Sequence, residues 1–563
     1  MSVAETPENI ALRLRPIADA HPAQIAMASP LGSHRDGTSR AYNTMNFAEL
    51  ELHTSSIAAG FQEMGIGPGK RIVMLVRFGA DFISLVFALL KAGAVVILID
   101  PGMGRKNLLK CLEATNPDGF VAIPAAHAIR MAMSKRFPNA KLNVTVGPRF
   151  GFLPKPTLSQ LAGTPSSLFQ PPEITQESEA AIIFTTGSTG PPKGVQYTHQ
   201  TFNNQVDQLV DRYNIRPGGK DLSGFPLFGL FNAVMGTTTV IPDMDPTKPA
   251  DVSPPKLMDA MDQWQINQAF GSPALWTTVG RYANEHERRV ESLKMVFSAG
   301  APVPPHVLEW MRKTMHPDGV MYTPYGATES LPVASIESRE VLEETAEKCQ
   351  QGQGTCVGDR FSGIEWKIVE ISDGPLESID QCRELQTGQI GELMVKGKVV
   401  TREYVTRTDQ NALHKVRDGD SFWHRMGDVG YLDEQNRFWC CGRKSHRVRI
   451  SENASEDLFT EPTEALFNNH PKIHRCALVG VGEPGSQTPV VVAEPWPEER
   501  PKDRVGEDQL IRELKQIAES NEGTKSIQDI FIFPKRLPTD IRHNSKIFRE
   551  QLAPWAQKEL SSR

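Results

Sequence analysis

The chain has 563 residues, and 61 Lys and Arg against 67 Asp and Glu give it a formal net charge of −6 at pH 7. Its hydrophobic fraction of 39% is typical of a globular protein and excludes a disordered chain, a collagen and a disulfide-rich scaffold. The mildly acidic balance also lacks the strongly basic character of nucleic-acid-binding proteins. At roughly 150 residues per domain, we expect three to four folded units and no nucleic-acid partner.

Seven cysteines, none in a C-x-x-C pair, are typical of a reduced, cytoplasmic protein rather than of a zinc or disulfide framework. The first 16 residues lack a basic stretch followed by an apolar one, so no secretory signal is expected. The longest apolar stretch, residues 82–99, is interrupted by Lys91 and Gly93 and is shorter than the roughly 20 apolar residues that a bilayer requires. It predicts a buried helix followed by a buried strand, and no membrane span.

From Arg71 onward, short and continuously apolar runs alternate with helical segments, which indicates parallel strands buried on both faces. We predict a helix over 80–91 and strands over 72–76, 94–99, 119–123 and 142–146. A Pro-rich passage, residues 153–175, predicts a surface connection between two α/β lobes. A second series then follows, with strands over 180–184, 237–241 and 293–298 and helices over 200–213 and 304–315. Such alternation is typical of doubly wound sheets.

After residue 357 the pattern changes to short alternating strands, for example over 391–395 and 429–441. The last segment, 443–563, predicts a small α+β domain with strands over 477–481 and 489–493 and a helix over 507–519. The predicted fold is therefore α/β. A large N-terminal domain (1–442) with two doubly wound α/β lobes and a small β-rich subdomain precedes a small, mobile α+β C-terminal domain (443–563).

The most informative stretch is IIFTTGSTGPPKGVQY, residues 182–197. A buried strand leads into a run of hydroxyl residues and glycines, followed by Lys193; the run is Thr185, Thr186, Gly187, Ser188, Thr189 and Gly190. Glycines let backbone N–H groups approach an anion, hydroxyls donate to phosphate oxygens and the ammonium adds charge. It is not a Walker loop, because Pro192 precedes the lysine and Gly194 follows it. The stretch predicts a polyphosphate cradle; the alternative is a polar turn between a strand and a helix.

This loop resembles that of the acyl-adenylate-forming superfamily, which includes acyl-CoA synthetases, luciferases and peptide-synthetase adenylation domains. Further motifs follow in the order of that family: LKAGAVVILIDP (90–101), FSAGAPV (297–303), YGATE (325–329), GDVGYLD (427–433), GRK (442–444) and NSKIFR (544–549). The resemblance covers nearly the whole chain. It implies an adenylation domain (1–442), a mobile lid (443–563) that carries a catalytic lysine, and ATP and Mg²⁺ as cofactors.

The same resemblance assigns the nucleotide contacts. It places the ring of Tyr325 on the adenine, with Gly326 in the same motif and the backbone of Gly300 and Ala301 beside it. Asp428 is expected to accept hydrogen bonds from the ribose hydroxyls. Singly, each residue also has a structural explanation, since an Asp after Gly is usually a turn residue and a buried Tyr is usually core.

The catalytic positions come from the resemblance too. Thr328 is expected to bind the α-phosphate and Glu329 to hold Mg²⁺, a hard cation that prefers carboxylate and phosphate oxygens. Arg443 is expected to contact ribose or phosphate at the domain boundary. Lys546 is expected to stabilise the charge that develops when a carboxylate attacks the α-phosphate and pyrophosphate leaves.

Three departures from the family put the use of CoA in question. Ser445 stands where an Asp or Lys is general, no glycine lies between Arg443 and Pro462, and Ser545 replaces the usual glycine before the lysine. These departures, with DIRHNSKIFRE (540–550) and FPLFGLF (225–231), resemble the β-lactone synthetase branch of bacterial long-chain olefin biosynthesis. Such enzymes adenylate a long-chain 2-alkyl-3-hydroxy acid, whose own hydroxyl then attacks the acyl carbon to give a β-lactone, AMP and pyrophosphate. The branch also implies other enzymes of the olefin pathway as partners in a multi-enzyme assembly.

Other interpretations stay open. The chain could be a medium- or long-chain acyl-CoA ligase, a fatty acyl-AMP ligase, or a non-catalytic nucleotide- or acyl-binding scaffold. Gly229 stands where many relatives carry a gating His, so we hypothesise that it leaves room in the acyl pocket for a branched chain. His424 and Arg425 could touch the nucleotide or belong to the core, and the Cys440–Cys441 pair predicts strand packing rather than a metal site.

Overall fold

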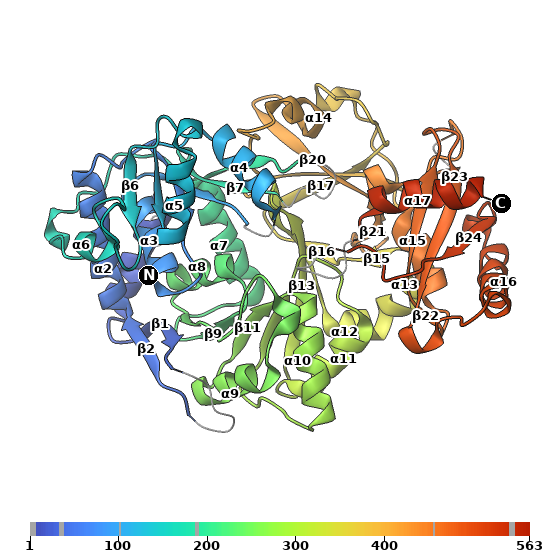
Figure 1. The fold of residues 1–563 in the computed structure, drawn as a ribbon, viewed down its shortest axis with the longest axis horizontal. Helices are drawn as coiled ribbons and strands as arrows, with labels where there is room; N and C mark the ends of the chain where they lie inside the picture. Colours follow the sequence, from blue (N-terminus) through green and yellow to red (C-terminus); the bar gives the residue numbers. More distant parts are fainter. Residues whose placement is uncertain are drawn as a thin grey trace.

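A computed structural model describes residues 7–32, 39–100, 103–185, 191–453, 456–539 and 547–562. Within these ranges the strands form four sheets, and helices pack against them (Figure 1). The α/β class predicted from the sequence is confirmed.

The first sheet and its helices form the upper left lobe of Figure 1. The strands are β3 (Arg71–Leu75), β4 (Val95–Leu98), β5 (Gly119–Ala122), β6 (Leu142–Thr145), β7 (Glu179–Phe184) and β8 (Gly194–Thr198), and the helices nearby in the chain are α1 (Leu14–Ala20), α2 (Phe47–Glu63), α3 (Ala80–Lys91), α4 (Arg105–Ala114), α5 (Pro124–Ala132) and α6 (Leu158–Leu161). The strand order is β6-β5-β3-β4-β7-β8, parallel except for the antiparallel β7–β8 pair.

Helix α3 and strand β4 form the buried helix and strand predicted for residues 82–99. Gly93, at φ +80°, lets the chain turn from the helix into the strand, a conformation that favours glycine. Lys91 is fully buried, and its ammonium lies 2.7 Å from the Glu51 carboxylate and also donates to Thr54 and Ser55 of α2. A charge in the apolar stretch is therefore tolerated because α2 supplies its partners.

The second sheet is larger and forms the lower part of Figure 1. Its strands are β1 (Ile25–Pro30), β2 (Tyr42–Asn46), β9 (Lys220–Ser223), β10 (Thr238–Val240), β11 (Gln268–Gly271), β12 (Met295–Ser298), β13 (Val320–Ala327), β14 (Ser330–Glu337) and β16 (Asp359–Arg360), in the order β16-β14-β13-β12-β11-β9-β10-β1-β2. The helices of this part of the chain are α7 (His199–Tyr213), α8 (Pro226–Met235), α9 (Pro254–Trp264), α10 (Pro273–Glu285), α11 (Pro305–Thr314), α12 (Ser338–Glu340) and α13 (Ala346–Gln350).

The sequence predicted that the Pro-rich passage 153–175 connects the two lobes. This prediction is wrong. The passage runs from β6 to β7, two strands of the same sheet. The chain crosses between the sheets elsewhere, because β1 pairs with β10 of the second sheet, and β2 pairs with β1, before β3 begins the first sheet. Proline-rich composition marks a surface crossover, but the strands it joins are set by tertiary pairing.

A third, smaller sheet is largely antiparallel. It contains β15 (Thr355–Cys356), β17 (Ile364–Val369), β18 (Gly391–Gly397), β19 (Lys415–Asp418), β20 (Ser421–Leu432) and β21 (Phe438–Arg443), with α14 (Asn411–His414) beside them. The C-terminal domain, at the right of Figure 1, has β22 (Ile473–Val481), β23 (Thr488–Pro495) and β24 (Asp529–Ile532) with α15 (Thr460–Asn468), α16 (Arg504–Ser520) and α17 (Arg549–Ser561).

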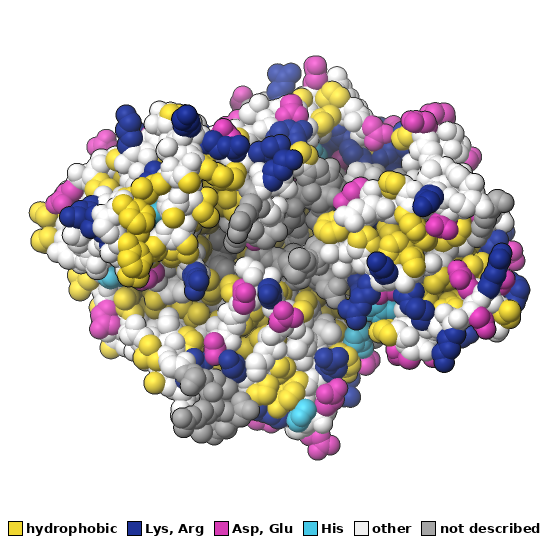
Figure 2. Space-filling model, viewed as in Figure 1, with side chains coloured by type: hydrophobic (Ala, Val, Ile, Leu, Met, Phe, Trp, Pro, Cys, Tyr) yellow, Lys and Arg dark blue, Asp and Glu magenta, His cyan; other side chains and the backbone are white. Residues whose placement is uncertain are grey.

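The surface agrees with the near balance of charges in the composition. Positive and negative side chains are interspersed over the visible face (Figure 2). Among the described residues, no helix has the length and apolar character that a bilayer crossing requires.

Candidate active site

The glycine- and hydroxyl-rich loop joins β7 to β8, two adjacent strands of the first sheet. At its base the backbone N–H of Thr185 donates to the Lys193 carbonyl at 3.0 Å, and the Lys193 N–H donates to the Thr185 hydroxyl at 3.1 Å. These bonds close the neck of a strand–loop–strand hairpin. The loop residues Thr186, Gly187, Ser188, Thr189 and Gly190 lie outside the described residues, so the cradle itself stays a prediction.

Lys193 and Glu329 are brought together across the lobes, with Tyr404 between them. The Lys193 ammonium lies 3.6 Å from the Glu329 carboxylate and donates to the Tyr404 hydroxyl at 3.2 Å. That hydroxyl in turn donates to Oε1 of Glu329 at 2.7 Å, and the ammonium lies 4.5 Å from the centre of the tyrosine ring. Three side chains from three parts of the chain thus form one closed cluster.

Segments from two sheets hold this cluster in place. Glu329 lies in the turn between β13 and β14, and its carbonyl accepts from both the N–H and the hydroxyl of Thr401, at 2.9 Å each. Residues 403–406 run beside β8: the Val405 N–H donates to the Gly194 carbonyl at 2.9 Å. The neighbouring Thr328 offers its carbonyl to the Tyr197 hydroxyl at 2.6 Å.

The surroundings keep Glu329 ionised. Burial raises the pKa of this carboxyl group, but the Lys193 ammonium and the Tyr404 hydroxyl together lower it below its ordinary value. Burial lowers the pKa of Lys193 despite the opposing effect of Glu329. A single buried carboxylate beside a lysine is a donor set that fits a magnesium ion whose other ligands are phosphate oxygens and water.

A second cluster joins Tyr325, Asp428 and Arg443. The Tyr325 hydroxyl donates to Oδ2 of Asp428 at 2.5 Å, and the Arg443 guanidinium lies 3.1 Å from Oδ1. Asp428 and Arg443 face each other across the β20–β21 pair. Each carboxylate oxygen can accept more than one hydrogen bond, so Asp428 can still accept from the hydroxyls of a ligand.

The turn containing Gly300 and Ala301 lies beside the Tyr325–Gly326 segment. Strands β12 and β13 are parallel neighbours, with Phe297 opposite Tyr322, so the residues that follow them meet at one edge of the sheet. Gly300 adopts φ +100°, a left-handed conformation that suits glycine at this bend. The edge therefore gathers the residues expected around an adenine.

The sequence analysis missed Tyr404 and a group of basic side chains behind it. Lys415 donates to the Thr401 carbonyl, and its ammonium lies 5.8 Å from the Tyr404 ring centre. The ring of His414 lies 5.8 Å from that of Tyr404 and 6.0 Å from that of His424. Burial lowers the pKa of Lys415 to about 7 and that of His414 to about 4. His424 was considered from the sequence, but no motif contains Tyr404, His414 or Lys415, because α14 and β19 bring the last two beside Tyr404 only in the folded chain.

The other residues considered in the sequence analysis lie outside the two clusters or outside the described residues. Arg425 belongs to the core, where it is 2.6 Å from Glu392 and almost fully buried, and His424 is buried as well. Cys440 and Cys441 lie on β21, and no group of metal-ligating side chains occurs among the described residues. Lys546 lies outside the described residues; Arg549, just after it, is 2.6 Å from Glu464 of α15.

Gly229 is packed on α8 rather than facing open space. A Cβ atom at this position would lie 3.4 Å from the Phe78 ring, 3.4 Å from a methyl group of Thr239 and 3.6 Å from the Ser223 hydroxyl. Phe228 on the same helix stacks on Phe270, with ring centres 4.3 Å apart. The hypothesis that Gly229 leaves room for a branched chain therefore lacks support from this packing.

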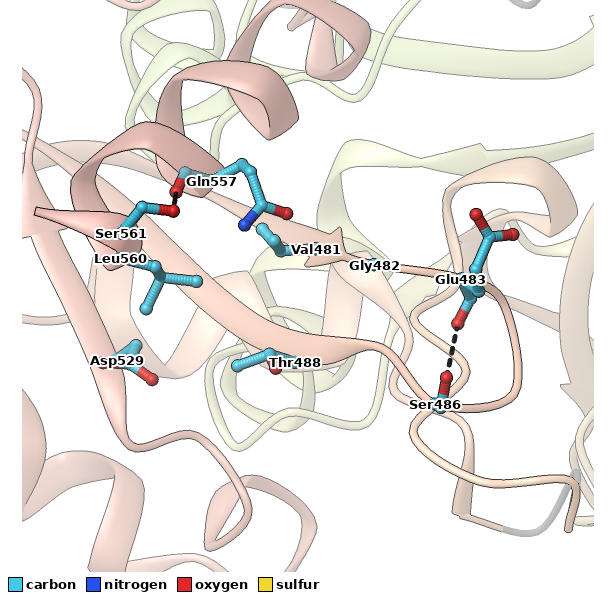
Figure 3. A pocket seen from close by; sticks show the side chains of 9 residues that line it. All are labelled: Val481, Gly482, Glu483, Ser486, Thr488, Asp529, Gln557, Leu560 and Ser561. Atoms are coloured by element: carbon cyan, nitrogen blue, oxygen red, sulfur yellow. Dashed lines mark hydrogen bonds between the residues drawn. The ribbon is translucent and has the colours of Figure 1, made fainter.

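Two surface hollows lie apart from these clusters. One, of about 770 Å³, lies between α7 and strands β17 and β18 and is lined by polar groups such as Gln208, Lys396 and Glu365. The other, of about 560 Å³, lies in the C-terminal domain between the end of β22 and the last turn of α17 (Figure 3). Neither is lined by a residue of the two clusters.

Known proteins resemble the chain in both sequence and fold. Residues 15–405 match the family described as AMP-binding enzyme. An olefin β-lactone synthetase of Stenotrophomonas maltophilia is 41% identical, with 99% of each chain covered, and one of Xanthomonas campestris pv. campestris is 40% identical, with 98% of each covered. The crystal structure of ATP-bound MatB from Rhodopseudomonas palustris has a TM-score of 0.76 at 19% identity, covering 98% of this chain and 100% of that one, and shares its fold.

Proposed function

Because the chain belongs to the AMP-binding enzyme family and is an adenylate-forming synthetase, we propose that it converts a long-chain 2-alkyl-3-hydroxy acid into a β-lactone. ATP is the second substrate, and AMP and pyrophosphate are the other products. The observation that carries this proposal is the 41% and 40% identity, over essentially the full length, to two olefin β-lactone synthetases. A 3-methylmercaptopropionyl-CoA ligase of Ruegeria lacuscaerulensis and a 4-coumarate–CoA ligase of Oryza sativa are 23% and 24% identical.

In the first step, the acid's carboxylate attacks the α-phosphate of ATP, and the bond to pyrophosphate breaks. Glu329 would hold Mg²⁺, and the bound ion would supply positive charge against the phosphate oxygens. Lys193 and the loop 186–190 bind the outer phosphates, and Thr328 binds the α-phosphate. Lys546 stabilises the charge that develops during the attack.

The nucleoside lies on the second cluster. Tyr325 stacks on the adenine beside Gly300, Ala301 and Gly326. Asp428 accepts from the ribose hydroxyls, and Arg443, which holds that carboxylate at 3.1 Å, contacts ribose or phosphate.

In the second step, the 3-hydroxyl oxygen bonds to the acyl carbon while the bond from that carbon to the AMP oxygen breaks; the hydroxyl proton is released. Because nucleophile and electrophile belong to one molecule, good orientation can replace roughly 7–11 kcal/mol of entropic and solvent cost, against the strain of a four-membered ring. No CoA is needed. Water has to be kept away from the adenylate, since hydrolysis competes with ring closure.

We place the domain boundary at residues 442/443, within the segment that departs from CoA-using relatives. Ser445 lies in a short helical turn, Lys444–His446, directly after Arg443. The lid from 443 to 563 would carry Lys546 toward the nucleotide, and the assembly partners would be the other enzymes of the same pathway.

Product analysis tests the proposal. The protein is incubated with ATP, Mg²⁺ and a synthetic 2-alkyl-3-hydroxy acid without CoA, and lipid products are identified by mass spectrometry and NMR. A β-lactone formed in equal amount with AMP is expected. The matched control is the 2-alkyl acid without the hydroxyl, which should stop at the adenylate. Strict dependence on CoA, or an adenylate that accumulates with the hydroxy acid, would reject lactone formation.

A further inference from the structure

The segment between Asp118 and Glu173 has an unusual charge for this chain. It carries six Lys and Arg residues and no Asp or Glu, whereas the whole chain has a net charge of −6. In the fold these residues form β5, α5, β6 and α6, at the outer end of the first lobe, where β6 is the edge strand. Lys135, Lys141 and Lys155 are exposed there. One end of an acidic protein is therefore locally basic.

The same segment exposes large apolar side chains. Phe152 is 70% exposed, Phe150 59%, Ile129 50% and Met131 37%. With Leu168, the segment holds five of the eleven large hydrophobic side chains that are exposed in the described part of the chain, although it is only about a tenth of the sequence. Exposed apolar patches of this kind mark interaction surfaces. Figure 2 shows hydrophobic side chains gathered over the region that Figure 1 labels α5 and β6, with Lys and Arg at the margin.

The loop that carries the two phenylalanines is held in a defined shape. The Leu153 N–H donates to the Phe150 carbonyl at 2.9 Å, and the Arg149 guanidinium donates to the carbonyls of Leu153 and Gly151 at 3.1 and 2.9 Å. Leu153 itself is buried. The exposed rings of Phe150 and Phe152 thus belong to an ordered turn that is anchored by its arginine and its leucine.

This turn lies on the side of the sheet where acyl chains are expected. Strands β3, β5 and β6 are parallel neighbours, so the residues that follow them meet at one edge. Phe78 follows β3 and packs against Gly229 of α8. Two strand spacings, ~10 Å, separate the ends of β3 and β6.

We propose that this basic apolar segment, with the exposed side chains of Phe150, Phe152 and Ile129 and the exposed lysines 135 and 141 before β6 and 155 after it, docks on a bilayer that contains anionic lipid. The phenylalanine rings enter the interface, and the lysines pair with anionic headgroups while their alkyl chains lie along the apolar zone. Exposed phenylalanine rings together with lysines are the combination that suits the boundary between the anionic headgroups and the acyl chains of a bilayer. Docking is peripheral and does not depend on which acid the enzyme uses.

Vesicle co-sedimentation of the full-length chain tests the proposal. The parent is expected to pellet with vesicles of phosphatidylglycerol and phosphatidylcholine, to pellet much less with phosphatidylcholine alone, and to be released by high salt, which screens the lysines. The double variant Phe150→Ser/Phe152→Ser is expected to lose about tenfold in partitioning, because two large apolar side chains no longer enter the interface. The triple variant Lys135→Gln/Lys141→Gln/Lys155→Gln is expected to lose the preference for phosphatidylglycerol.

Val505→Ser is the matched control, since Val505 is 73% exposed but lies on α16 of the C-terminal domain. It should pellet like the parent, and all variants should keep the parent's ATP–pyrophosphate exchange with a water-soluble acid. Equal pelleting of the parent and the double phenylalanine variant overturns the proposal, as does failure of the parent to bind either vesicle. A change in oligomeric state of the double variant on gel filtration, with unchanged vesicle binding, assigns the segment to a protein contact and also overturns it.

Discussion

At the scale of single residues, the cluster of Lys193, Glu329 and Tyr404 links the phosphate loop to the turn after β13. Tyr404 is the shared member, since its hydroxyl accepts from the lysine and donates to the glutamate. A carboxylate that holds a cation has to be ionised and fixed in orientation. The tyrosine contributes to both, because its hydrogen bond lowers the pKa of Glu329.

The first prediction removes this hydroxyl. Tyr404→Phe keeps the ring under the Lys193 ammonium but removes a hydrogen bond to the ionised Glu329 that is worth about 1.5–3 kcal/mol. Carboxylate-dependent ATP–pyrophosphate exchange should fall by about tenfold or more, with a larger Mg²⁺ requirement. Tyr431→Phe is the control, because that hydroxyl donates to the Gln353 carbonyl away from the site, at 3.0 Å. An unchanged Mg²⁺ dependence would show that Tyr404 has no part in orienting the carboxylate.

The second prediction concerns the pKa of Lys415. Burial lowers this pKa to about 7; the nearby Glu329 carboxylate opposes the shift, and the Lys193 ammonium adds to it. In the unfolded chain a lysine titrates near 10.4, so between pH 7 and that value the unfolded state binds more protons than the native state. Stability therefore rises with pH across this window, by at most about 1.4 kcal/mol per pH unit, and the penalty of burying the charge is fully present below pH 7.

Lys415→Met should remove this rise while preserving the packing on Tyr404 and Phe422. Melting temperatures are measured from pH 6.5 to 9.5. Relative to the parent, the melting temperature of the variant should be highest at pH 6.5, and the difference should become smaller as the pH increases. Lys396→Met serves as control, because Lys396 pairs with the partly exposed Asp418 at 2.8 Å. Parallel pH curves for the parent and Lys415→Met would mean that Lys415 keeps its proton in the native state.

At the scale of elements, α8 shows how a motif position acquires its meaning from packing. If Gly229 bordered an open acyl pocket, its substitution would meet no protein atoms. A Cβ atom at this position would instead contact Phe78, Thr239 and Ser223. The contact distances of 3.4–3.6 Å are ordinary van der Waals contacts for one methyl group, so a larger side chain would have to turn away from these neighbours or displace them.

The third prediction follows from these contacts. Gly229→Ala should be neutral or stabilising by about 0.5–1 kcal/mol, because alanine favours the helix and its methyl fits. Gly229→His should destabilise by about 1–3 kcal/mol through overpacking against Phe78. Differential scanning calorimetry of the two variants provides the comparison. If the histidine variant is as stable as the alanine variant, the helix can shift and the position is open to an imidazole after all.

At the scale of the whole molecule, the sequence predicted the α/β class and the strands β3 to β6, because continuous apolar runs and turn residues act locally. It assigned the strand over 180–184 to the second lobe, whereas β7 belongs to the first sheet. It did not predict that β1 and β2 join the second sheet, or that 153–175 stays within the first, because these depend on pairing between distant segments. The same holds for the site. Lys193 and Glu329 could be taken from motifs, whereas Tyr404 and Lys415 come close to them only through the third sheet.

A short basic segment after Arg443 contributes to holding the C-terminal domain against the N-terminal body, beside the contacts that α15 makes through Glu461 with Thr355 and that the following Asn469 makes with Gln350. The Lys444 ammonium is 2.9 Å from Glu392, and the Arg447 guanidinium is 2.8 Å from Asp373, which also lies 3.4 Å from Arg449. Glu392 belongs to β18, and Asp373 follows β17, so both acids are part of the third sheet. The segment about which the lid would rotate is therefore tied to the N-terminal body by ion pairs of different burial.

The fourth prediction concerns the more exposed of these ion pairs, in which Asp373 contacts Arg447 and Arg449. In Asp373→Asn the amide can still accept a hydrogen bond but loses the charge that Arg447 and Arg449 share, a change worth up to about 1 kcal/mol for a partly exposed pair. Amide hydrogen exchange over residues 444–449 should speed up by as much as about fivefold, and high salt should speed up the parent more than the variant. Asp380→Asn is the control, because Asp380 lies in the same exposed stretch and its carboxylate accepts from the Ser378 hydroxyl at 3.5 Å. If Asp373→Asn and the parent exchange equally at low salt, the Asp373 pairs do not hold this segment, and Lys444→Met, which removes the buried pair with Glu392, becomes the next variant to measure.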